Sequence, residues 1–248
     1  MMGIITQQSA FAQTIINTEK LQSYAKPGWF AGLQSDVNLE RGNSEVFEIA
    51  GQSIIGYQQT HHAIKLLSGL KYLTEDQNSI TSRNFLQVRY NYILNPTYRT
   101  FSFYQYQHNK SLILKSRQIV GAGLRRKFGS KDLPTFHLGM GLMYENEMLN
   151  KSKLLPGESS SLNRLRVDAI GFFNYSITSN TTLTNSTYYQ PAVSDFGDFR
   201  LFDEMSLNVA INKYAELNLS FLWRYDHQPP GTLKKYDINI TSGIGIHI

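Results

Sequence analysis

The chain has 248 residues and a formal net charge of +5, from 24 Lys and Arg against 19 Asp and Glu. It contains no cysteine, which excludes disulfides, thiolate catalysis and zinc–thiolate sites. No apolar run reaches the roughly 20 residues of a transmembrane helix. No dense basic run indicates a nucleic-acid partner either, so the positive charge predicts only a modest surplus of surface bases.

The N-terminal segment divides into two parts. Residues 1–13 read MMGIITQQSAFAQ, and Ala10-Phe11-Ala12 before Gln13 has the small-x-small form of a secretory cleavage site. The apolar stretch before it is short and has no basic start. We therefore expect a remnant of an export signal, with an ordinary N-terminal segment as the alternative. Residues 14–28 form a polar lead-in that ends at Pro27-Gly28.

From residue 29 onward the sequence alternates apolar and polar residues in short runs separated by turn residues. Because successive side chains of a strand point to opposite faces, each run predicts a strand with one apolar and one polar face. The strands are expected at 29–39, 46–57, 64–72, 85–94, 98–108, 112–128, 136–147, 164–177, 181–190, 200–211, 215–226 and 236–248. About twelve strands predict one all-β domain over residues 29–248, an antiparallel up-and-down transmembrane β-barrel.

The links between these runs differ in length according to their order. Long links follow odd-numbered strands, as at 150–161 and at Pro229-Pro230-Gly231, whereas tight turns such as Ser179-Asn180 follow even-numbered ones. Outer-membrane barrels have long extracellular loops and short periplasmic turns, so we expect both termini on the periplasmic side. The last hairpin is expected to close the barrel against the first strand.

The polar face carries most of the charge. Packing these groups inside a soluble barrel would be very costly unless all were paired, which favours a membrane barrel with a polar interior. Ten bases against nine acids predict a paired network in a narrow, largely occluded lumen. The bases are Lys65, Lys71, Arg89, Lys115, Arg117, Arg125, Lys127, Arg164, Arg166 and Arg224, and the acids are Asp36, Glu48, Glu145, Glu147, Asp168, Glu204, Glu216, Asp226 and Asp237.

Aromatic residues gather near the strand ends of the apolar face, where an outer-membrane barrel carries aromatic girdles. The chain holds 15 Tyr and 14 Phe but only 2 Trp. The girdle residues expected from the alternation are Trp29, Tyr57, Tyr72, Tyr144, Trp223, Tyr225 and Tyr236.

Several segments resemble one family. RYDHQPPGTLKKYDINITSGIGIHI (224–248) is similar to the C-terminal signature of YdiY-like proteins, a domain-of-unknown-function family of outer-membrane barrels, some described as salt-induced outer membrane proteins. The segments 85–128, 138–147 (LGMGLMYENE), 188–201 (YYQPAVSDFGDFRL) and 27–33 (PGWFAGL) carry further similarity. The resemblance implies a bacterial outer-membrane barrel and no catalytic residues. One departure is Ile248, since such barrels commonly end in an aromatic residue.

Few residues suggest chemistry of their own. Glu145 and Glu147 lie on one strand face, where partnership with lumen arginines outweighs acid–base catalysis. His61-His62 lacks a third metal ligand and predicts a solvated turn. His108 raises an outer-membrane lipase, for which no serine partner can be placed. Four loop lysines could bind lipopolysaccharide phosphates, with ordinary solvated loops as the alternative. These are Lys151, Lys153, Lys234 and Lys235.

The sequence therefore predicts a non-enzymatic barrel of the cell outer membrane, either structural or a narrow solute channel. No cofactor or metal is expected. The expected partners are outer-membrane lipid, lipopolysaccharide among it, and the barrel-assembly machinery during biogenesis. The alternatives are a lipid-hydrolysing outer-membrane enzyme and a soluble periplasmic barrel that binds a lipid.

Overall fold

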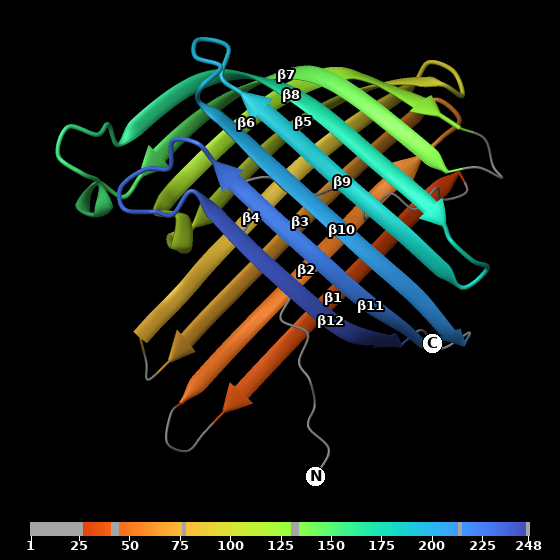
Figure 1. Cartoon of the computed structure of the whole chain (residues 1–248), viewed down its shortest axis with the longest axis horizontal. Helices are drawn as coiled ribbons and strands as arrows, with labels where there is room; N and C mark the ends of the chain where they lie inside the picture. Colours follow the sequence, from red (N-terminus) through yellow and green to blue (C-terminus); the bar gives the residue numbers. More distant parts are fainter. Residues whose placement is uncertain (1–26, 41–44, 76–77, 130–133, 213–214, 247–248) are drawn as a thin grey trace.

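The computed structural model describes residues 27–40, 45–75, 78–129, 134–212 and 215–246 (Figure 1). The expected export signal at 1–13, all but the end of the polar lead-in at 14–28, and Ile248 lie outside the described residues. Among the described residues, no helix is long and apolar enough to cross a membrane.

Within this part of the chain there are twelve β-strands and two 3₁₀ turns, which confirms the predicted all-β fold. The strands are β1 (Gly28–Glu40), β2 (Val46–Gln58), β3 (His62–Glu75), β4 (Asn78–Ile93), β5 (Tyr98–Asn109), β6 (Leu114–Phe128), β7 (Thr135–Leu149), β8 (Ser161–Ser176), β9 (Thr181–Pro191), β10 (Phe199–Asn212), β11 (Ala215–Asp226) and β12 (Tyr236–Ile246). The 3₁₀ turns are η1 (Lys110–Leu112) and η2 (Lys151–Lys153).

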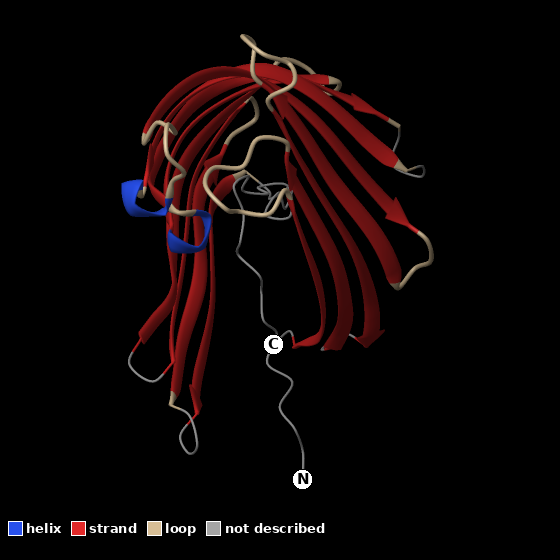
Figure 2. Cartoon of the chain, turned by 60° about the vertical axis from the view of Figure 1, so that its left-hand side comes forward, coloured by secondary structure: helices blue, strands red, loops and turns tan. Residues whose placement is uncertain are grey.

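Each strand pairs antiparallel with its neighbour in sequence, so the sheet order is β1 to β12, as an up-and-down barrel requires. Figure 2 shows the sheet curling round a central space. In the described part of the chain, however, no ladder joins β1 to β12, contrary to the expected seam. The end of β12 carries Gly243 and Gly245, and a glycine-rich strand specifies its register weakly.

Strand β4 differs most from its prediction. It begins at Asn78 rather than at Phe85, because it continues to pair with β3 as far as Glu75↔Asn78. A register shift beside Leu73 accommodates the extension. The polar residues of 78–84 show no clear alternation, so the pairing comes from the adjacent strand rather than from local sequence preference.

The outer face of the sheet is apolar and exposed. On neighbouring strands, Val120 is 55%, Leu142 53% and Met140 67% exposed, and similar residues follow on every strand. A band this large on a water-soluble surface would be unusual, because monomeric proteins rarely expose large contiguous apolar patches. The exterior is therefore suited to lipid, and the fold is that of a transmembrane β-barrel.

The expected girdle residues all lie on this outer face. Trp29 and Tyr57 pack together at the end with short turns, with ring centroids 5.0 Å apart, and Trp223 and Tyr225 lie 6.3 Å apart near the long loops. Trp29, Tyr72, Tyr144 and Tyr236 are exposed, whereas Tyr57, Trp223 and Tyr225 are partly exposed. A hydrogen-bonded polar group also lies on this exterior: Asp203 accepts hydrogen bonds from Asn185 Nδ2 (3.0 Å) and Thr187 Oγ1 (2.5 Å).

Glycines on the inner face make room for aromatic rings from the next strand. The Phe30 ring lies over Gly56, and the Phe85 ring lies over Gly69, so that a β-carbon at either glycine would collide with the ring. Rings packed on strand glycines hold the register and fill space inside a curved sheet. The interior is thus occupied by side chains.

Leu219, 45% exposed on the outside of β11, provides a test of the lipid-facing surface. We predict that Leu219→Arg lowers the free energy of unfolding in lipid vesicles by roughly 2–4 kcal/mol if the residue lies near the bilayer midplane. Urea titration followed by tryptophan fluorescence measures the change. Leu155→Arg, at an equally exposed loop position, should change it little; equal losses at both positions would contradict the assignment.

Candidate functional site: a charged cluster inside the barrel

A cluster of buried charged groups lies inside the barrel near the end with the long loops. Arg117 lies near the start of β6, Glu145 and Glu147 near the end of β7, and Arg166 near the start of β8. Arg200 is the second residue of β10. Because adjacent strands are antiparallel, these starts and ends meet at one end of the sheet, and the alternation turns all five side chains inward.

Arg166 is the most enclosed member, with 0% of its surface exposed. Its Nε donates to Glu145 Oε1 at 2.6 Å, and its Nη2 donates to Asp198 Oδ1 at 3.0 Å. Its Nη1 donates to the main-chain oxygens of Asp198 (2.9 Å) and Gln190 (3.1 Å). One guanidinium therefore joins strands β7 and β8 to the link between β9 and β10.

Arg200 connects the same carboxylates to the other side of the cluster. Its Nη1 donates to Glu145 Oε2 at 2.9 Å, and its Nη2 donates to both oxygens of Glu147 at 3.2 and 3.3 Å. Its Nε donates to Asp226 Oδ2 at 3.1 Å. Arg117 also donates to Glu147. Arg164 completes the cluster through Asp198 Oδ2, at 2.7 Å.

The cluster is balanced in charge. Its members are Arg117, Arg164, Arg166 and Arg200 on one side and Glu145, Glu147, Asp198 and Asp226 on the other. A buried ion would be very costly alone, but each carboxylate here has more than one cationic or polar donor. The arrangement therefore ties strands together across the interior at the end with the long loops.

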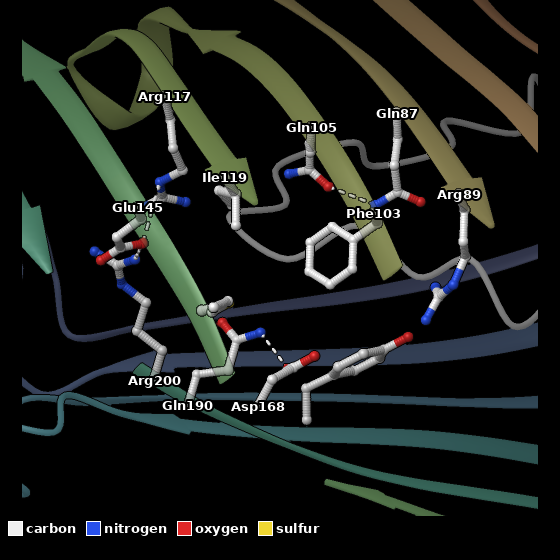
Figure 3. A pocket seen from close by; sticks show the side chains of 12 residues that line it. Gln87, Arg89, Phe103, Gln105, Arg117, Ile119, Glu145, Asp168, Gln190 and Arg200 are labelled. Carbon is white, nitrogen blue, oxygen red and sulfur yellow. Dashed lines mark hydrogen bonds and ion pairs between the residues drawn. The ribbon is translucent and has the colours of Figure 1, made fainter. Parts of the chain in front are cut away.

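Polar and then apolar side chains continue inward from the cluster. Gln87 Nε2 donates to Gln105 Oε1 at 2.8 Å, and Gln190 Nε2 donates to Asp168 Oδ1 at 2.8 Å (Figure 3). A cavity of about 30 Å³ lies among these residues, which is room for roughly one or two waters.

Below this layer, an apolar cluster packs across the lumen. It brings side chains from β5 together with side chains from β8 to β11, and its members are Phe101, Ile170, Tyr188, Phe202 and Leu222. The Arg89 guanidinium lies over the Phe101 ring, 5.2 Å from its centroid. Strands on opposite sides of the barrel are therefore in contact through their side chains.

The structure places most of the expected lumen residues inside. Glu48, Lys65, Lys71, Arg89, Arg117, Arg125, Glu145, Glu147, Arg166, Asp168, Glu204 and Arg224 are buried, and Lys127, Arg164, Asp226 and Asp237 are partly buried. Some of these form smaller ion pairs apart from the cluster: Lys71 with Glu48 at 2.6 Å, and Arg224 with Asp237. The side chains of Asp36 and Glu216 are not among those that the structure describes.

The expectation that Lys115 lies inside the barrel is wrong, because its side chain is exposed. The pairing of β6 shifts register between Leu114 and Ser116 on one side and opposite Gln107 and Asn109 on the other. A β-bulge adds a residue and reverses the alternation beyond it. Leu114 is therefore buried, and Lys115 points outward.

Two members of the cluster, Asp198 and Arg200, were not among the expected lumen residues. Arg200 has the same parity in β10 as Glu204, which was expected inside, so the alternation contained the signal. Asp198 lies in the link between β9 and β10, where no alternation applies. Its main-chain oxygen accepts from Ala192 N at 2.8 Å, and this short turn directs its carboxylate inward.

The residues considered for catalysis or metal binding have other contacts. His108 Nδ1 is 2.9 Å from the main-chain oxygen of Lys115. His62 Nδ1 is 2.7 Å from the Tyr90 hydroxyl. Glu145 and Glu147 are bound by arginines, as above. In the described ranges, no group of three or more His, Cys, Asp or Glu side chains could hold a metal ion.

Comparisons give a family and distant structural likenesses. Residues 37–248 match the family described as protein of unknown function, DUF481, in agreement with the resemblance to YdiY-like proteins. No match to the chain was found among curated proteins. The NanC porin is similar with a TM-score of 0.48 and 12% identity, over 89% of this chain and 99% of the porin.

Two further solved structures show similar values. The KdgM porin in complex with disordered oligogalacturonate has a TM-score of 0.43 and 11% identity, over 89% of this chain and 98% of that one. The translocator domain of the autotransporter NalP from Neisseria meningitidis has a TM-score of 0.45 and 11% identity, over 92% and 91%. These likenesses are too distant to transfer a function.

The balance of the cluster gives a stability prediction. Arg200→Met should lower the free energy of unfolding by about 3–5 kcal/mol, because it leaves Glu145 and Glu147 with uncompensated buried charge. Adding Glu147→Gln should recover part of that loss, since it restores the balance. Unfolding in lipid vesicles measures both changes, and strictly additive losses would show that the two residues do not interact.

Proposed function

We propose that this chain, which belongs to the DUF481 family of proteins of unknown function, is an outer-membrane β-barrel whose own side chains close its lumen. Its role is then structural, or that of a narrow solute channel, rather than that of an open porin or an enzyme. The observation that carries the proposal is the buried, charge-balanced cluster around Arg166 and Arg200.

The outer membrane is favoured because of the way polar and apolar groups are divided. Apolar side chains face outward on every described strand, and most of the ionic groups of the strands face inward. A lipid bilayer contains no water to satisfy an open sheet, so a spanning β structure has to approach a closed barrel. Barrels of this kind are typical of bacterial outer membranes, with their long loops outside the cell. The long links at 150–160 and 227–235 would then face the exterior.

A closed lumen is favoured by the contents of the barrel. An ion-selective pore needs a water-filled path with an excess of one charge along its wall. Here four bases and four acids neutralise one another at the end with the long loops, and an apolar cluster packs below them. The cavity beside Gln105 and Asp168 is the feature that favours a narrow path over complete closure, since it lies between these two layers.

Planar-bilayer recording tests the proposal. The unmodified protein should show no stable conductance steps, because charged and apolar layers both fill the lumen. The variant Glu147→Ser/Arg200→Ser/Phe202→Ala removes one neutral ion pair and one ring of the apolar cluster, so it should conduct. Removing one acid with one base keeps the remaining charges balanced.

Leu219→Ala, a truncation on the lipid-facing surface, is the matched control and should stay silent. Heat-dependent migration on detergent gels verifies that each variant is a folded barrel. Porin-like steps from the unmodified protein would overturn the closed lumen. A folded triple variant that never conducts would show that these residues are not what closes it.

A further inference from the structure

An apolar groove of about 550 Å³ lies on the outer face of strands β4 to β8, separate from the lumen. It is lined by Val88, Tyr90, Ser102, Phe103, Tyr104, Val120, Gly121, Ala122, Leu142, Tyr144 and Leu165. The groove belongs to the lipid-facing surface, because Val88, Tyr104, Val120, Leu142 and Tyr144 are all strongly exposed.

Small residues in neighbouring strands produce this groove. Ser102 of β5 pairs with Ala122 of β6, so two short side chains lie side by side in one row of the sheet. Larger residues border that row: Tyr90 pairs with Ser102 on one side, and Leu142 pairs with Ala122 on the other. A hollow between aromatic and aliphatic borders has the shape and chemistry of a seat for a hydrocarbon chain.

A row of amide side chains lies above the groove, toward the long loops. Gln118 of β6 pairs with Asn146 of β7, and Asn146 pairs with Asn163 of β8. Asn146 Nδ2 donates to Asn163 Oδ1 at 2.6 Å, and the Tyr104 hydroxyl donates to Gln118 Oε1 at 3.4 Å. Amides in place of Leu, Val and Met mark the change from hydrocarbon to headgroup environment.

Exposed lysines stand beyond the amide row. Lys115 points outward because of the bulge at the start of β6, and Lys110 of η1 lies just before that strand. Lys151 and Lys153 of η2 follow the end of β7, and all four are exposed. The two 3₁₀ turns are held together, since Asn150 N donates to the main-chain oxygen of Ile113 at 2.7 Å.

Glu158, the acid of the loop that follows η2, is already used within that loop. Glu158 accepts from Leu155 N at 2.7 Å and from Gly231 N at 3.0 Å, and so fixes the loop after η2 to the loop between β11 and β12. Its carboxylate therefore serves the loop structure. Lys115, Lys151 and Lys153 accordingly give this rim a positive charge above the apolar groove.

We propose that the outer face of β4 to β8 is a binding site for a phosphorylated lipid of the outer leaflet. One acyl chain would lie in the groove between Tyr104, Ala122 and Leu142, with its carbonyl region at the amide row. The phosphate groups would accept charge-assisted hydrogen bonds from Lys115 and from Lys151 and Lys153 of η2. The proposal rests on the outer-membrane location proposed above.

The spacing along the strands fits such a molecule. Ala122 and Gln118 are four residues apart in β6, which is roughly 13 Å in a strand that rises about 3.3 Å per residue. Lys115 lies three residues further along. Along the strands, the apolar groove is followed by the amide row and then by the lysines. A membrane lipid has the same order of acyl chain, ester or amide region and phosphate.

Lipid binding by the delipidated full-length protein in detergent tests this site. Native mass spectrometry with diphosphorylated lipid A as the probe should show one tightly held molecule. Lys115→Glu should weaken binding about tenfold, as expected for one lost charge-assisted contact. Arg126→Glu, the same charge change on β6 at the opposite rim, should leave affinity within about twofold, since it is remote from the site.

Two further arms separate the headgroup from the acyl chain and from free anions. Ala122→Trp fills the groove and should weaken both diphosphorylated and dephosphorylated lipid A, whereas Lys115→Glu should affect only the phosphorylated form. Inorganic phosphate should not compete at millimolar concentration, because it lacks the acyl chain. Competition by phosphate would make this a simple anion site and overturn the lipid proposal.

Equal binding by Lys115→Glu, Ala122→Trp and the unmodified protein would likewise overturn it. Heat-dependent gel migration is recorded for each variant, so loss of the barrel is distinguished from loss of the lipid. A folded barrel that holds no lipid contradicts only this inference, whereas an unmodified protein without a folded form contradicts the proposed barrel.

Discussion

The requirement to neutralise buried arginines governs the interior of this barrel. Arg166 is fully enclosed, and each of its three nitrogens donates to an oxygen of Glu145, Asp198 or Gln190. Leaving any of these charges unpaired in a lipid-surrounded lumen would cost several kcal/mol. The cluster is therefore formed as a unit, and it fixes the relative positions of β6, β7, β8 and β10 at the end with the long loops.

This constraint also connects the structure of a loop to the charged cluster. Asp198 belongs to a link rather than to a strand, and it enters the cluster only because a short turn, with an Asp198 N to Asp195 O hydrogen bond of 2.9 Å, directs it inward. The link between β9 and β10 thus supplies one carboxylate of the cluster inside the barrel. Outside, β6, β7 and β8 also line the apolar groove, so these strands combine an ionic interior with an apolar exterior.

The alternation of apolar and polar residues allowed the fold to be predicted from the sequence. A strand of a membrane barrel has its apolar face toward lipid and its polar face toward the interior. The alternation also put Glu145, Glu147 and Arg166 on the inner face. It failed where the alternation is interrupted. The bulge at the start of β6 moved Lys115 outside, and the partners of Asp198 depend on a turn. Which inward charges meet one another depends on strand register and loop conformation, neither of which residue spacing specifies.

The absence of native cysteine permits a direct test of the closed lumen. Ser186 lies inside the barrel and is 2% exposed, whereas Ser159 lies in an exposed loop. Single cysteines at the two positions, in protein reconstituted into vesicles, would be treated with a membrane-impermeant maleimide. A closed lumen predicts rapid labelling of Ser159→Cys and negligible labelling of Ser186→Cys from either side of the membrane. Labelling of both cysteines at the same rate would show a water-filled path through the barrel and contradict the account.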